Sequence, residues 1–286
     1  MSVWGTRMNI LFWNIGLTKN RNKNLEKIHD CIREMLIEND VDLLILAEYP
    51  YDTRSLCQIV NAASAIQYKT IPNISSSYRI RGIINSNYKI ESLQEQDRYQ
   101  LVKIGTSYYE LIVAMIHNIS KYHNDPPTQR IEITQFYNDI ADSEQRLNCD
   151  YTIAIGDFNI NPFEEACIRG NAMHAIPFAD VVLKNKSRKI RNKTCKTFYN
   201  PTWKFFANEK APYTTYYQNR GQEINFYWYA LDQVIVRPSL INVFDEKMLK
   251  IISQTNQHNL LSNGTPDKIN YSDHLPLFCT LKEEKI

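Results

Sequence analysis

Eight polar residues stand at or near the ends of apolar runs, where they could carry out metal-assisted and acid–base chemistry. They are Asn14, Glu48, His117, Asp157, Asn159, Asp232, Asp273 and His274. Alternate side chains of a strand face the same way, so Asp157 and Asn159 should project together while Phe158 turns into the core. Their carboxylate and carboxamide oxygens are hard donors, which suit Mg2+ or Mn2+ and can hold a water molecule.

Each of these residues alone also has a structural explanation. Asn14 and Asp273 could cap turns, Glu48 could pair with a surface lysine, and Asp232 could accept a hydrogen bond from a backbone amide. Either histidine could be a hydrogen-bonded structural residue. Eight such groups at strand ends favour one shared polar cleft, because α/β folds place ligands at strand ends.

Apolar runs that favour strands precede or contain most of these residues. The longer runs cover 8–14, 41–47, 108–117, 151–155, 225–236 and 277–281, and shorter ones cover 77–84, 88–92 and 100–104. Many neighbouring runs are joined by connections too short for a helical crossover, so we expect mixed and antiparallel pairing.

Apolar residues at helical intervals predict helices between the strands. We expect them over 25–36, 54–66 and 126–147 and from residue 163 onwards. In the third helix, the side chains expected to face the core are Ile131, Phe136, Ile140 and Leu147. The pattern predicts an α/β (α+β) chain. Two packed sheets with helices outside would fit it, but composition does not settle that topology.

The composition is that of an ordinary globular protein. The 286 residues are 43% hydrophobic and 22% charged, and the net charge of +2 gives no whole-molecule field that favours a polyanion. No apolar run is long enough to span a membrane, and no secretory signal is present, which predicts a soluble cytoplasmic protein. We expect one domain over 8–286 after a short lead at 1–7, with Cys31 and Cys279 as core residues. The sequence does not indicate an oligomeric state.

The order of the strand-end residues resembles the endonuclease/exonuclease/phosphatase superfamily of divalent-metal phosphodiesterases. The resemblance rests on WN at 13–14, a strand ending in Glu48, a strand ending in His117, GDFN at 156–159, LDQV at 231–234 and SDH at 272–274. It implies a four-layer sandwich with two central mixed β-sheets flanked by helices.

The resemblance also implies roles around the metal. Glu48 would be the principal ligand of Mg2+ or Mn2+, with Asn14 and Asp273 as further ligands. Asp157 and Asn159 would orient or deprotonate the attacking water, and Asp157 could hold a second metal ion.

The two histidines and one aspartate complete this assignment. His274 would contact the scissile phosphate while Asp232 fixes its ring, because a carboxylate partner raises the pKa of a histidine and favours the charged form. His117 would contact phosphate or protonate the leaving oxygen. Ala47 and Ala230 depart from the residues that many relatives carry at these positions, but neither departure removes an expected ligand.

A basic run at 184–196 precedes an aromatic stretch at 198–217, and we expect Lys189, Arg191 and Lys193 to bind substrate phosphates. The alternative is a solvated insertion whose aromatic rings pack on the domain. Together these features predict a metal-dependent nuclease whose partner is nucleic acid, with DNA favoured over RNA. The alternatives are a phosphatase of small phosphoesters or lipid headgroups and a catalytically silent nucleic-acid-binding module.

Overall fold

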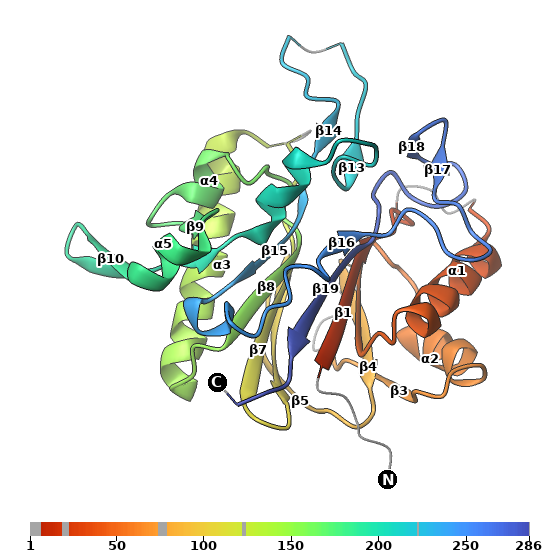
Figure 1. Cartoon of the computed structure of the whole chain (residues 1–286), viewed down its shortest axis with the longest axis horizontal. Helices are drawn as coiled ribbons and strands as arrows, with labels where there is room; N and C mark the ends of the chain where they lie inside the picture. Colours follow the sequence, from red (N-terminus) through yellow and green to blue (C-terminus); the bar gives the residue numbers. More distant parts are fainter. Residues whose placement is uncertain (1–6, 19–22, 74–78, 122–123, 222, 286) are drawn as a thin grey trace.

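Two large β-sheets face each other at the centre of the computed structural model (Figure 1). The structure describes residues 7–18, 23–73, 79–121, 124–221 and 223–285. The six-stranded sheet has the order β16 (Lys250–Ile251), β19 (Leu277–Lys282), β1 (Arg7–Asn14), β2 (Leu43–Ala47), β4 (Ile80–Asn85) and β3 (Tyr68–Thr70). The seven-stranded sheet has the order β5 (Lys89–Glu95), β6 (Tyr99–Gly105), β7 (Glu110–His117), β8 (Thr152–Asp157), β15 (Asp232–Val236), β12 (Phe198–Tyr199) and β9 (Ala175–Ile176).

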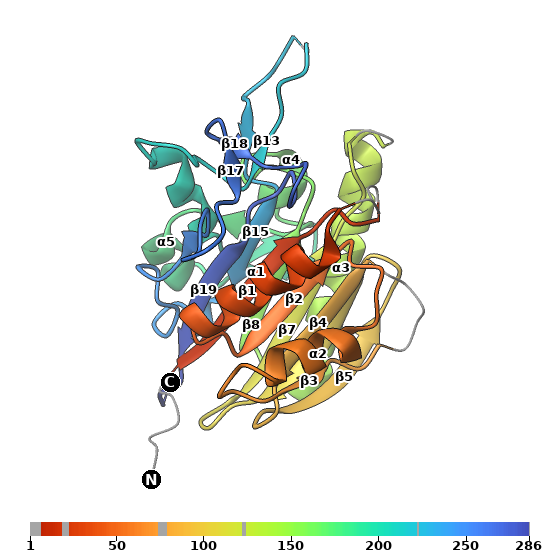
Figure 2. The same cartoon turned by 90° about the vertical axis from the view of Figure 1, so that its right-hand side faces the viewer.

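Helices cover the outer faces of the two sheets. Figure 2 shows α1 (Leu25–Glu38) and α2 (Thr53–Asn61) over the six-stranded sheet. The outer face of the other sheet is covered by α3 (Pro126–Leu147) and α4 (Glu165–Ile168), whereas α5 (Ala179–Lys184) packs beside β9 and β12 and places Val182 in the core between the sheets. Short 3-10 helices η1 (Pro201–Ala207) and η2 (Pro238–Leu240) flank β15. Three hairpins extend from this body: β10 (Ser187–Ile190) with β11 (Lys193–Lys196), β13 (Tyr216–Tyr217) with β14 (Trp228–Tyr229), and β17 (Leu261–Ser262) with β18 (Thr265–Pro266).

The side-chain alternation of the central strands explains the layers. On β1, Ile10 and Phe12 enter the core between the sheets, whereas Leu11 and Trp13 enter the core under α1 and α2. Both sheets are mixed, since β1 is parallel to β2, β7 to β8 and β9 to β12, while the other neighbouring strands of the two sheets are antiparallel. The predicted fold of two central mixed sheets between helical layers is confirmed.

Several predicted boundaries and one core assignment are wrong. Ile131 is 65% exposed, because the buried face of α3 carries Ile133 and Phe136, and Ile131 lies about 200° around the helix from Ile133. The helix predicted over 54–66 ends at Asn61, and the strand predicted over 225–236 is divided into β14 and β15. β1 begins at Arg7, inside the predicted lead, whose residues 1–6 lie outside the described residues.

Two predictions about buried cysteines are confirmed, since Cys31 and Cys279 are fully buried and free. Within the described ranges, no helix combines the length and the apolar character needed to cross a membrane.

Candidate active site

Three neighbouring strands of the seven-stranded sheet place three expected site residues in one row. His117 at the end of β7 is paired with Asp157 at the end of β8, and Asp157 is paired with Asp232 at the start of β15. The exposed fractions of these residues are 7%, 1% and 0%. Sheet register therefore brings together ionisable groups that are up to 115 positions apart in the sequence.

The six-stranded sheet contributes Asn14 and Glu48 from its two central strands. Asn14 ends β1, and Glu48 follows β2 with a positive φ of 54°. Asn14 Nδ2 donates a hydrogen bond of 2.9 Å to Asp157 Oδ2, which links the two sheets at the site. Thr18 Oγ1 donates a hydrogen bond of 2.6 Å to Glu48 Oε2. Glu48 is only 5% exposed, and this hydrogen bond holds its carboxylate in a fixed orientation.

His117 lies between acidic groups from the two sheets. Its Nε2 is 3.5 Å from Glu48 Oε1 and 3.8 Å from Asp157 Oδ2. The imidazole therefore connects the carboxylate after β2 with the one at the end of β8.

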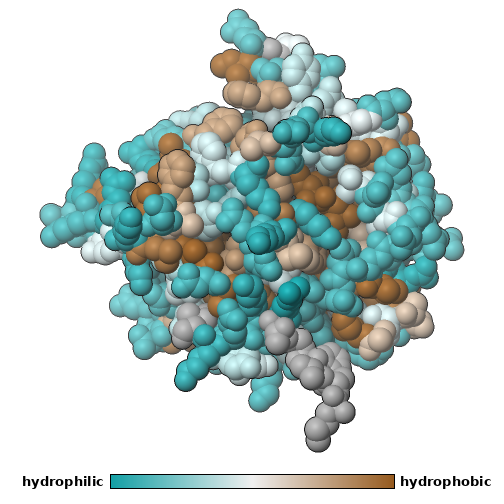
Figure 3. Space-filling view, viewed as in Figure 1, coloured by the Kyte–Doolittle hydropathy of each residue, from teal (hydrophilic) through white to brown (hydrophobic). Residues whose placement is uncertain are grey.

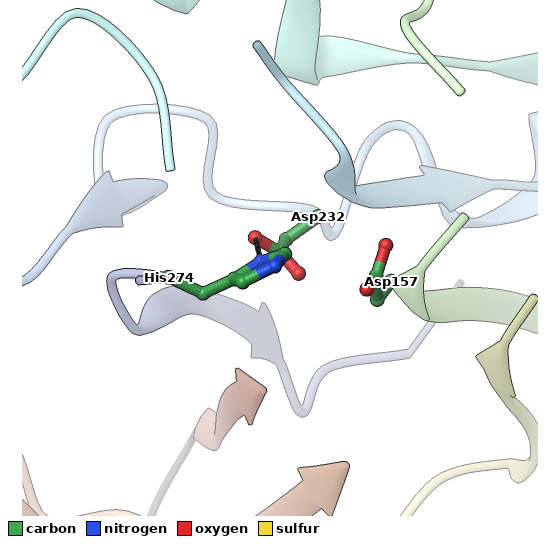
Figure 4. A group of neighbouring side chains, drawn as sticks. All are labelled: Asp157, Asp232 and His274. Atoms are coloured by element: carbon green, nitrogen blue, oxygen red, sulfur yellow. Dashed lines mark hydrogen bonds and ion pairs between the residues drawn. The ribbon is translucent and has the colours of Figure 1, made fainter. Parts of the chain in front are cut away.

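His274 lies in the turn before β19 and faces Asp232 (Figure 4). The distance from His274 Nδ1 to Asp232 Oδ2 is 2.8 Å. Trp13 Nε1 donates to the carbonyl oxygen of His274 at 2.9 Å, and the backbone N–H of His274 donates to Ser272 Oγ at 3.1 Å. Ser272 Oγ in turn donates to the carbonyl oxygen of Asn14 at 2.6 Å, so β1 fixes the turn that carries the histidine.

Burial and neighbouring charges shift two pKa values in the cluster. Burial raises the pKa of Asp157 to about 7, although the charge of His274 lowers it. Burial lowers the pKa of His274, but the charge and hydrogen bond of Asp232, with the charges of Asp157 and Asp273, outweigh it and raise that pKa to about 10. At neutral pH His274 is therefore an imidazolium ion.

Asp157, Asp232 and His274 form a compact buried cluster. One ligand atom each from Asp157, Asp232 and His274 lies within 4.8 Å of the others, a spacing that a metal site can also show. His274 Nδ1 lies 2.8 Å from Asp232 Oδ2, so we describe these three residues as an ion-paired group.

Asn159 turns back to Asp157 as its place in GDFN suggests. Its backbone N–H donates to Asp157 Oδ1 at 2.8 Å, and its Nδ2 is 3.1 Å from Asp157 Oδ2. The same Nδ2 donates to the carbonyl oxygen of Asn118 at 2.9 Å, and Gln129 donates to the carbonyl oxygen of Asn159 at 3.0 Å. Phe158 is fully buried, as predicted. The carboxylate and the carboxamide thus share one polar site.

Asp273 lies at the margin of this cluster. It is half-buried, and its Oδ1 would lie 3.5 Å from a Cβ built on Gly16, so it faces the loop after β1.

The structure does not bring Lys189, Arg191 and Lys193 to the cluster. They belong to the β10–β11 hairpin, which projects at the left edge of Figure 1, whereas the site lies where the central strands end. Lys193 Nζ contacts Asn138 of α3 at 2.8 Å. Their predicted substrate contacts are therefore not part of the site geometry.

Comparison of the amino-acid sequence with family models finds no match, and comparison with curated proteins finds none. Comparison of the structure finds similar folds. TDP2 from D. rerio, complexed with a single-strand DNA product, is 15% identical with a TM-score of 0.55 over 96% of this chain and 98% of its own. An endonuclease/exonuclease/phosphatase family protein from Leptotrichia buccalis is 13% identical with a TM-score of 0.54 over 95% and 98% of the two chains. The chain has the endonuclease/exonuclease/phosphatase fold.

A third structure with this fold is the 3′ phosphatase NExo from Neisseria bound to a product DNA hairpin. It is 14% identical with a TM-score of 0.54 over 95% of this chain and 98% of its own. The resemblance inferred from the strand-end residues is thus confirmed at the level of the endonuclease/exonuclease/phosphatase fold.

Sequence reasoning gave no role to several residues that support the site of this endonuclease/exonuclease/phosphatase fold, although Trp13 and Ser272 stand in the WN and SDH motifs. Thr18, Trp13 and Ser272 contact site residues directly. Ser272 could have been found from its place beside Asp273 and His274, but nothing local distinguishes Thr18, because its contact with Glu48 depends on how two strands pack.

Tyr216 is a further residue that sequence reasoning did not assign to the site. Its ring centroid is 4.6 Å from that of His274, and the two residues form an isolated β-bridge. An aromatic side chain therefore lies against the imidazole of the ion-paired group.

Proposed function

We propose that this protein is a divalent-metal-dependent phosphodiester hydrolase that acts on nucleic acid, with DNA favoured over RNA. The observation that carries the proposal is the arrangement around Asp157. Its carboxylate contacts Asn14 and Asn159 and lies beside the imidazolium of His274, which is itself paired with Asp232. A buried cation next to a carboxylate that can hold water suits attack on a negatively charged phosphorus centre.

The donor set of the site fits a hard divalent cation. Glu48 and Asp157 are buried carboxylates that lie 3.5 Å and 3.8 Å from His117 Nε2. Asn14 adds a carboxamide oxygen, Oδ1, which accepts a hydrogen bond of 3.2 Å from the backbone N–H of Gly16. Burial raises the pKa of Asp157, which is the response of an acid whose negative charge lacks full compensation. We assign Glu48, Asn14 and Asp273 as the residues that hold Mg2+ or Mn2+. When bound, the ion supplies charge neutralisation at the phosphoryl oxygens.

The chain's own residues supply the other functions of a hydrolysis. Asp157, oriented by Asn159, positions a water and accepts its proton as the water oxygen bonds to phosphorus. His274 stabilises the negative charge on a non-bridging oxygen, and Asp232 holds its ring. His117 gives a proton to the leaving oxygen as the ester bond breaks, or binds a phosphate oxygen.

Aromatic rings beside His274 support nucleic acid as the substrate. We define the aromatic arm as residues 213–221 and 223–229, which Figure 1 shows projecting at the top of the molecule through β13 and β14. From the Tyr216 ring, successive centroid distances lead to Tyr229 at 6.3 Å, Phe226 at 6.2 Å and Phe163 at 5.5 Å. Phe226 is 56% exposed. Bases of single-stranded nucleic acid stack on exposed rings of this kind.

DNA is favoured because two proteins of similar fold are described with DNA products, TDP2 with a single strand and NExo with a hairpin. NExo also gives a second candidate, because it is a 3′ phosphatase. A phosphate monoester at a DNA end would present the same non-bridging oxygens to His274.

A substrate panel tests the proposal. The purified chain is incubated with Mg2+, with or without EDTA, and with single-stranded DNA, duplex DNA, RNA, 3′-phosphorylated DNA, phosphoinositides or a generic diester. We expect cleavage of a polynucleotide that EDTA abolishes and that the Asp157→Asn variant lacks. The matched control is Asp142→Asn, an exposed carboxylate on α3, which should cleave normally.

The panel also separates the alternatives. Release of phosphate from 3′-phosphorylated DNA without cleavage of an internal bond would select the phosphatase. Binding of DNA without turnover of any substrate would identify a silent binding module and refute the enzyme.

A further inference from the structure

The basic run that sequence reasoning assigned to substrate forms a separate surface. We define the basic projection as residues 178–196, which contain α5, β10 and β11. This segment holds seven lysines and arginines and one acid, Asp180. Within the described part of the chain, five exposed cations of the projection form no ion pair: Lys184, Lys186, Arg188, Lys189 and Arg191. The projection therefore carries an uncompensated positive charge that the candidate active site does not use.

Apolar side chains are exposed beside these cations. Phe178 is 62% exposed, Ile168 is 47% exposed, and Val181 and Leu183 are each 37% exposed. Figure 3 shows apolar atoms gathered over α5 at the left of the molecule, next to the hydrophilic hairpin. Exposed apolar side chains that gather in a patch rimmed by polar residues mark an interaction surface.

The body of the protein holds the projection in place. Val182 is fully buried, so α5 turns one apolar residue inward while its neighbours Val181 and Leu183 stay outside. A Cβ on Gly170 would lie 2.1 Å from Ile190 Cδ1, so the loop after α4 closely contacts the hairpin. Lys193 is tied to α3 through Asn138. The exposed cations and apolar side chains are thus presented on an anchored element.

We propose that the basic projection is a peripheral docking surface for an anionic lipid bilayer. Anionic headgroups complement the five cations, and the acyl boundary of the bilayer can take up Phe178 and its apolar neighbours. A polynucleotide would account for the cations but leave the aliphatic side chains in water. The projection extends outward from the body (Figure 1), so it can enter the headgroup region of a bilayer.

Vesicle sedimentation tests this surface. The full chain is mixed with vesicles of phosphatidylcholine alone or of phosphatidylcholine with phosphatidylserine. We expect binding to the anionic vesicles that weakens as salt is raised. Reversing Arg188, Lys189 and Arg191 to Glu should lower the partition coefficient about 100-fold or more. Phe178→Ser should lower it about 10-fold, because it removes apolar area and leaves the charge unchanged.

A charge-matched control separates this surface from a general effect of net charge. Reversal of Lys89, Lys247 and Lys268, which are exposed elsewhere, changes the net charge equally and should leave vesicle binding within about 3-fold, since the contribution of a charge falls off within a Debye length. Far-ultraviolet circular dichroism checks that every variant is folded.

Three results would overturn the proposal. They are equal binding to both kinds of vesicle, anionic binding that survives the charge reversal or Phe178→Ser, and failure to bind anionic vesicles. If the projection variants then weaken binding of duplex DNA, the surface is assigned to a polynucleotide. None of them bears on the proposed hydrolase, because the variants lie outside its site and cleavage is measured separately.

Discussion

His274 Nδ1 lies 2.8 Å from Asp232 Oδ2, and this pair links the turn before β19 to the start of β15. The two residues come from different sheets, so the ion pair forms only when the sandwich is assembled. The charge of Asp232 keeps His274 protonated at neutral pH, beside the carboxylate of Asp157, which we propose holds the attacking water.

Replacing Asp232 by Asn should impair turnover more than it impairs substrate binding. The amide can still contact the imidazole but lacks the charge that raises the pKa of His274, so less imidazolium remains at neutral pH. We expect kcat to fall about 10²- to 10⁴-fold and the pH profile of the remaining activity to shift to lower pH. Steady-state kinetics across pH checks both effects, and an unchanged profile would contradict the assigned role.

Replacing His274 by Gln should change stability in a pH-dependent way. In the wild type the pKa of His274 is raised from 6.5 to about 10, so protonation stabilises the fold fully below about pH 6.5 and this contribution is lost as pH rises through about 10. The free energy of unfolding of wild type should exceed that of the variant by on the order of a few kcal/mol at neutral pH, and the difference should shrink towards pH 10. Urea unfolding of the metal-free proteins measures it, and a difference that grows with pH would have the wrong sign.

Replacing Glu48 by Gln should weaken binding of the divalent ion. The amide keeps the size of the side chain but removes the charge, so we expect the Mg2+ concentration for half-maximal activity to rise by a factor of about 10² or more. Calorimetric titration with Mn2+ provides a readout independent of turnover. Glu26→Gln, at an exposed position on α1, is the control and should behave as wild type. Equal Mn2+ affinity in all three proteins would remove Glu48 from the metal site.

Replacing Thr18 by Val should produce a smaller effect of the same kind. The variant loses the 2.6 Å hydrogen bond that orients Glu48, while the side chain keeps its shape. We expect a 10- to 100-fold loss of metal affinity, as is common when a residue that orients a ligand is removed. The Mn2+ titration that is used for Glu48→Gln measures this loss, and Thr18→Ser should restore most of the affinity.

Removing an exposed ring from the aromatic arm should separate long substrates from short ones. Phe226→Ser deletes a stacking surface beyond Tyr229, so KM for single-stranded DNA should rise about 10-fold because stacking contributes about 1–3 kcal/mol per base. Turnover of a small generic diester should be unchanged. Steady-state kinetics on both substrates measures the difference. Equal losses of activity on the two substrates would show that the ring stabilises the fold and does not bind the DNA strand.

Local sequence was sufficient to place candidate site residues at strand ends, and the resemblance of their order to a known superfamily indicated the fold. The apolar runs that form β1 and β8 stop at or next to Asn14 and Asp157, so both residues could be placed at strand ends without coordinates. Glu48, His117 and His274 followed from the same reasoning, and their order along the chain indicated the sandwich.

Tertiary structure alone decided how these groups meet and which predicted groups do not. The 2.9 Å contact between Asn14 and Asp157 depends on how the two sheets pack, and the contact of Thr18 with Glu48 depends on how β1 and β2 lie together. No local pattern in the sequence specifies either contact. Likewise, Lys189 is only 32 positions from Asp157 in the sequence but belongs to a hairpin at the edge of the molecule. Side-chain periodicity is a property of each strand, whereas proximity is fixed by register and packing between distant strands, which only the folded chain specifies.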